Sequence, residues 1–131
     1  MKTCLVTTDQ QHKETLSAAL RVLSSDKPLV AERLDITELG LIAPDLVIVV
    51  DVLPLPYDLI EAIRMTRFVV PRCLIAVYTA TLSSAWSHAC HLAGANCMLA
   101  TTSDRDELTR GLRRALTTGC FTAPAFDSTN P

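Results

Sequence analysis

Glycine is scarce in this sequence and long apolar segments are absent. Both facts exclude particular classes of function. Its four glycines do not form the loop that cradles phosphate groups in nucleotide-binding proteins. The GxSxG turn that carries the nucleophile of many hydrolases is also missing. No apolar run approaches the roughly 18 to 20 residues that span a bilayer. We therefore expect neither an enzyme nor a membrane protein.

The chain also lacks an excess of basic residues. Its formal net charge is -2 and its isoelectric point is near 5.8. Domains that bind nucleic acid usually carry a clustered positive excess. We therefore do not expect this segment to bind DNA by itself.

Paired cysteines are missing as well. The five cysteines are odd in number, show no CxxC spacing and mostly fall in or beside apolar runs, which is typical of reduced thiols in the cytoplasm. His88, Cys90, His91 and Cys97 could be grouped as a zinc site, but Cys90 would point away from the two histidines on a helix. We expect no bound metal and no other cofactor.

The apolar residues that are present alternate between the period of a strand and that of a helix. With 131 residues, 49% of them hydrophobic, the chain suits one domain. Between residues 35 and 42 there is room for a short or irregular helix only. Strands are predicted over residues 3–7, 29–34, 46–50, 73–78 and 96–99, and the longer helices over residues 11–24, 57–66, 83–93 and about 105–118.

The last helix has clear boundary signals. Asp104 and Glu107 have the spacing of a capping box, and Gly119 stops the helix. The remaining residues are rich in Pro, Asp, Ser and Asn, as linkers are. We therefore predict one domain over residues 1–119 and a linker or tail over residues 120–131.

Alternating strands and helices predict a doubly wound α/β fold with a parallel sheet. In such folds, functional residues gather at the carboxyl ends of the strands. Four segments of this chain fall there: Thr7-Thr8-Asp9, Val50-Asp51, Thr79-Ala80 and Thr101-Thr102.

Several motifs of this sequence resemble parts of the receiver domain of bacterial response regulators (CheY-like). The matching motifs are Val77-Tyr78-Thr79-Ala80, Ala93-Gly94-Ala95-Asn96, Asp104-Arg105-Asp106-Glu107-Leu108 and the run from Pro44-Asp45 through Pro54 to Glu61. Gly119-Cys120-Phe121 with Pro124 resembles the segment that leads to the output domain in helix-turn-helix regulators of the LuxR type. The resemblance implies a flavodoxin-like three-layer αβα sandwich with five parallel strands in the order 2-1-3-4-5.

The resemblance also identifies what the site has lost. A receiver transfers a phosphoryl group to one of its aspartates. Two acidic residues help to hold Mg²⁺, a Thr or Ser contacts the phosphoryl oxygens, and a lysine pairs with the charge. In this sequence the acidic pair falls on Thr7 and Thr8, the phosphoacceptor on Val50 and the lysine on Thr101, and only Thr79 is retained. The phosphoacceptor region is therefore predicted to be degenerate.

Two carboxylates lie one residue away from the expected positions. Asp51 could act as the phosphoacceptor, with Asp9 helping to hold Mg²⁺, if both strands shifted by one residue, but such a shift turns side chains to the opposite face. The alternative is that Asp9 caps a helix or stabilises a turn and that Asp51 is a loop carboxylate near Pro54.

These observations favour a phosphorylation-independent pseudo-receiver that acts by dimerisation or by binding a signalling protein, with DNA bound only through a separate output domain. A phosphorylated receiver using Asp51 and a sensor of a small molecule remain alternatives. Four arginines of the last helix are candidates for the interaction surface, with solvated side chains as the alternative: Arg105, Arg110, Arg113 and Arg114.

Overall fold

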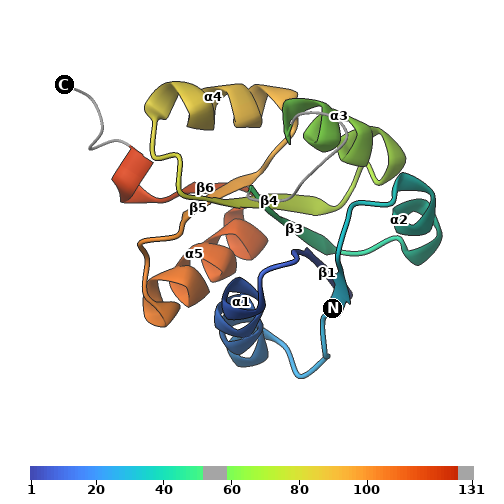
Figure 1. The fold of residues 1–131 in the computed structure, drawn as a ribbon, viewed down its shortest axis with the longest axis horizontal. Coiled ribbons are helices and arrows are strands. Elements are labelled where there is room, and N and C mark those ends of the chain that lie inside the picture. The colour runs from blue at the N-terminus through green and yellow to red at the C-terminus, as the bar shows by residue number, and fades with distance from the viewer. Residues whose placement is uncertain (52–58, 127–131) are drawn as a thin grey trace.

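A computed structural model describes residues 1–51 and 59–126 as a parallel sheet covered by helices on both faces (Figure 1). The strands are β1 (Thr3–Val6), β2 (Leu29–Ala31), β3 (Leu46–Val50), β4 (Leu74–Thr79), β5 (Cys97–Ala100) and β6 (Phe121–Thr122). The helices are α1 (Gln10–Leu23), α2 (Ile36–Ile42), α3 (Leu59–Val69), α4 (Ser84–Ala93), α5 (Arg105–Thr118) and the short 3-10 helix η1 (Pro124–Phe126).

The sheet has the order β2-β1-β3-β4-β5-β6, and every neighbouring pair is parallel. Helices α1 and α5 cover one face, and α2, α3 and α4 cover the other (Figure 1). The predicted α/β class and the order of the first five strands are thus confirmed, whereas the sixth strand was not predicted. The first two residues of the helix predicted over residues 57–66 lie outside the described residues, and so does Pro54.

The buried strands explain why the sheet needs helices on both sides. All five residues of β3 are fully buried, and they alternate between the two apolar cores. Val47 and Val49 belong to the core beneath α2, α3 and α4, while Ile48 and Val50 belong to the core beneath α1 and α5. This alternation is the normal consequence of successive strand side chains pointing to opposite faces.

Polar side chains set where the helices begin. Before four of the helices, a side chain accepts a hydrogen bond from a backbone N–H in the first turn. These capping residues are Asp9, Asp35, Ser83 and Asp104. The capping box predicted for the last helix is present. The second helix is short, as predicted, with seven residues. Within the described residues no helix is long and apolar enough to cross a bilayer.

The chain continues to pack after α5 ends. Phe121 N–H donates to the Asn96 carbonyl at 3.0 Å, and Ala123 N–H donates to the Met98 carbonyl at 3.0 Å, so this segment runs beside β5. The Phe126 side chain is fully buried in the core beneath α2, α3 and α4. The described residues after Gly119 therefore pack against the sheet through backbone hydrogen bonds and the buried Phe126 side chain.

Candidate functional site

The carboxyl ends of β3 and β4 meet through a hydrogen bond. Thr79 Oγ1 donates to Asp51 Oδ2 at 2.7 Å and accepts from the Thr81 backbone N–H at 3.0 Å. The Asp51 backbone N–H donates to the Tyr78 carbonyl at 3.0 Å, which fixes the start of the turn after β3. The Thr79 side chain is buried. The structure thus pairs the retained threonine with the nearest carboxylate.

Val50 has a different environment. Its side chain is fully buried in the core beneath α1 and α5, and it lies opposite Tyr78 in the β3–β4 register. Asp51, the next residue, follows the alternation to the other face, on the same side as Val77 and Thr79. Asp51 therefore reaches Thr79 without any shift of register, and the shift that we had considered necessary is absent from β3.

Asp9 serves the fold. Its Oδ1 accepts a hydrogen bond from the His12 backbone N–H at 3.0 Å, which caps α1. This hydrogen bond lowers the pKa of the Asp9 carboxyl below its usual value. Its own N–H donates to Thr7 Oγ1 at 3.1 Å. The structure thus agrees with the alternative interpretation of Asp9 as a capping residue.

The other three predicted positions carry no charge. Thr7 is buried, Thr8 is exposed, and Thr101 is half-buried, with its backbone N–H donating to the Thr79 carbonyl at 3.1 Å. Neither a carboxylate, the usual ligand of Mg²⁺, nor a positively charged side chain stands at these positions. Across residues 1–51 and 59–126, no group of three His, Cys, Asp or Glu side chains is arranged to hold a metal ion.

The grouping considered for zinc is used by the fold. The His91 ring lies between the Ala95 carbonyl oxygen, 2.9 Å from Nδ1, and Thr122 Oγ1, 2.8 Å from Nε2, so it ties the end of α4 to β6. Burial, with a smaller contribution from the charge of Asp51, raises the pKa of the Cys90 thiol to about 12. A thiol with such a pKa stays protonated and is a poor ligand or nucleophile at neutral pH.

Two aromatic environments carry no signal in the sequence. The rings of His12 and Tyr78 meet edge to face, with centroids 5.2 Å apart and an interplanar angle of 84°. Trp86 Nε1 is buried and has no hydrogen-bond partner in the part of the chain that the structure describes. Both environments depend on how α1 and α4 pack on the sheet, so neither could be inferred from the spacing of residues.

Comparison with known proteins identifies the architecture. No protein-family model matches the sequence, and no curated protein matches it. Solved structures do match, and one of them is the isolated receiver domain of RcsB from Salmonella enterica serovar Typhimurium, determined with the phosphomimetic BeF3⁻. It superposes with a TM-score of 0.82 at 14% identity and covers 100% of this chain and 99% of that one. The chain has the fold of a receiver domain.

Two LuxR-family regulators support the same assignment of fold. A two-component response regulator from Aurantimonas sp. SI85-9A1 gives a TM-score of 0.74 at 24% identity, covering 97% of this chain and 92% of that chain. A DNA-binding response regulator from Silicibacter pomeroyi gives 0.73 at 16% identity, covering 95% and 98%. The superposition therefore covers nearly the whole length of both of those solved chains.

Proposed function

We propose that this receiver fold acts in signalling as a pseudo-receiver, through contacts with other proteins and without phosphorylation. The observation that carries the proposal is the absence of charge at Thr7, Thr8 and Thr101, which stand where the acidic pair and the lysine are expected. Val50 stands where the resemblance places the phosphoacceptor, whereas the carboxylate beside Thr79 is that of Asp51. The site therefore lacks both the metal ligands and the charge that phosphoryl transfer uses.

One observation favours the alternative, a phosphoacceptor at Asp51. Its carboxylate accepts from Thr79 Oγ1 at 2.7 Å, which brings it next to the one site residue that is retained. Asp9, the carboxylate that would have to support Mg²⁺ beside it, is held by the first turn of α1. Positive charge at Thr101 is also missing, so the pseudo-receiver remains the better supported function.

An amide NMR titration tests this choice. Mg²⁺ and then beryllofluoride, a phosphoryl mimic, are expected to leave the spectrum unchanged, because a single carboxylate without a cationic partner binds neither strongly. The Asp51→Asn variant is the control for weak binding of Mg²⁺ to surface carboxylates. Shifts at Asp51 and Thr79 that spread to β5 and vanish in Asp51→Asn would contradict the proposal and establish phosphoryl chemistry.

The interaction surface that we propose is the exposed side of α5. Arg105, Arg110, Arg113 and Arg114 are exposed, and no ion pair between any of these four guanidinium groups and a described carboxylate is formed. Three of them border a groove between α5 and the segment after it, whose floor includes Gly111 and Phe121. A cationic groove with an apolar floor suits an acidic surface, of a second copy or of a partner protein.

The double variant Arg110→Gln/Arg113→Gln tests this surface. We expect the dissociation constant of the dimer, measured by sedimentation or light scattering over a concentration series, to rise about tenfold, since each exposed ion pair contributes up to about 1 kcal/mol. The matched control is Arg64→Gln/Arg72→Gln, which removes the same charge from exposed residues on α3 and just after it. Equal effects of the two double variants would show that net charge, and not this groove, governs association.

A further inference from the structure

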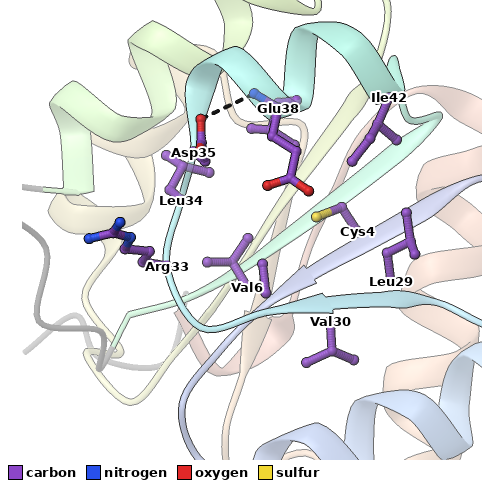
Figure 2. A pocket seen from close by; sticks show the side chains of 11 residues that line it. Cys4, Val6, Leu29, Val30, Arg33, Leu34, Asp35, Glu38 and Ile42 are labelled. Atoms are coloured by element: carbon purple, nitrogen blue, oxygen red, sulfur yellow. Dashed lines mark hydrogen bonds between the residues drawn. The ribbon is translucent and has the colours of Figure 1, made fainter.

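A small cavity lies between α2 and the β1–β2 side of the sheet, and nothing in the proposed function uses it (Figure 2). Its volume is about 100 Å³. The floor is formed by Cys4, Val6 and Leu39, which belong to the apolar core. Leu29 lines it from β2 and is 52% exposed, so the cavity opens to solvent at the sheet edge.

One carboxylate faces this apolar floor. The Glu38 side chain leaves α2 and extends toward Cys4 and Val6 (Figure 2). Its backbone N–H donates to Asp35 Oδ1 at 3.1 Å, which holds the first turn of α2 in place. Within the described residues, neither a hydrogen bond nor an ion pair engages its carboxylate. A negative charge therefore borders an apolar space and forms no ion pair with Arg33, the cationic side chain that also lines the cavity.

The environment of Cys4 agrees with this arrangement. Burial is the main cause that raises the pKa of the Cys4 thiol, and the charge of Glu38 raises it further. The thiol therefore stays protonated and behaves as a small apolar group. The cavity presents an uncharged floor, with the carboxylates of Glu38 and Asp35 and the guanidinium of Arg33 around it.

We propose that this cavity binds a small primary alkylammonium ion, with the alkyl chain on the apolar floor and the ammonium group against the Glu38 carboxylate. An ammonium ion satisfies the carboxylate by charge-assisted hydrogen bonds, while the alkyl chain removes apolar surface from water. Neither Asp51 nor Thr79 lines this site, and the site does not rest on the proposed interaction function.

Size and charge restrict the ligand. A cavity of about 150 Å³ accommodates benzene, so the smaller space here accepts a chain of about three carbon atoms. Arg33 also lines the cavity, and its guanidinium opposes a second positive charge on the ligand. Asp35, which could otherwise attract one, already caps α2. A singly charged ion with a short chain is thus favoured over a diamine.

The test is an amide NMR titration of the full chain with n-propylammonium chloride at constant ionic strength. We expect saturable shifts centred on Cys4, Val6 and Leu39, with a dissociation constant in the millimolar range, because so small a ligand has few atoms to contribute. The Glu38→Gln variant should bind about fivefold more weakly, the size of an exposed ion pair. The neutral isostere 1-propanol should bind more weakly to the unmodified chain.

Glu32→Gln is the matched control, since Glu32 is exposed on the same segment and does not line the cavity. Equal weakening by the two substitutions, equal binding of 1-propanol, or shifts that never saturate would overturn the proposal. Nα-acetyl-lysine methylamide carries the same chemistry and separates two sources. Its binding beside n-propylammonium would support a lysine side chain of another protein, whereas binding of n-propylammonium alone would support a free amine.

Discussion

Phe126→Ala is expected to lower the free energy of unfolding by about 3 to 5 kcal/mol, the usual cost of removing a buried aromatic ring. The Phe126 side chain is fully buried in the core beneath α2, α3 and α4. Its removal leaves a cavity and also weakens the anchor that holds β6 beside β5. Urea denaturation followed by circular dichroism measures the change.

Phe68→Ala is the matched control for this prediction. The Phe68 side chain on α3 is 87% exposed, so its truncation removes no core contact and should change the free energy of unfolding by less than about 0.5 kcal/mol. If Phe126→Ala were as mild as Phe68→Ala, the segment after α5 would contribute nothing to the fold, and the domain would end near Gly119 as the sequence had indicated.

Arg67→Met should destabilise the fold by about 3 kcal/mol, through acceptors that lose their donors. The guanidinium group of Arg67 donates to the Gly94 carbonyl through Nε at 3.2 Å and through Nη2 at 2.7 Å. It also donates to the carbonyls of Pro71 and Cys73, at 2.9 and 2.7 Å, and to Asn96 Oδ1. One side chain therefore joins the end of α3 to the turn before β4 and to the turn between α4 and β5.

Arg64→Met is the corresponding control, because Arg64 is exposed on the same helix and should tolerate the change to within about 0.5 kcal/mol. Arg67→Lys should recover only part of the stability, since an ammonium group cannot reproduce the fork of donors. Thermal denaturation of the three variants compares them directly. Full recovery by lysine would mean that charge alone, and not the hydrogen bonds, accounts for the effect.

Local patterns in the sequence predicted most of the helices and strands. The apolar run over residues 46–50 predicted a strand, and the structure forms β3 there and buries all five of its residues. Asp104 and Glu107 predicted the start of α5, and both hydrogen bonds of the capping box are present. These signals succeed because they depend on neighbouring residues and on simple periodicity.

Features that depend on distant residues were not predictable in the same way. Asp51 and Thr79 are 28 residues apart, and their contact depends on the register of β3 against β4. Alternation along β3 places Asp51 on the face opposite Val50, but only the register of β3 against β4 shows that Asp51 lies beside Thr79. Arg67 gave no signal, because most of its acceptors are backbone carbonyl groups, which no residue type reveals. Phe126 was hidden in a segment whose polar composition resembles a linker.

The sixth strand also changes the borders of the sheet. Long open borders are templates on which other chains add strands, and natural proteins guard against this with short edge strands and prolines. Here β6 has two residues and is followed closely by Pro124, while β2 has three and directly follows Pro28. Neither border offers a long template, so this chain should resist aggregation through its backbone and meet other molecules through side chains.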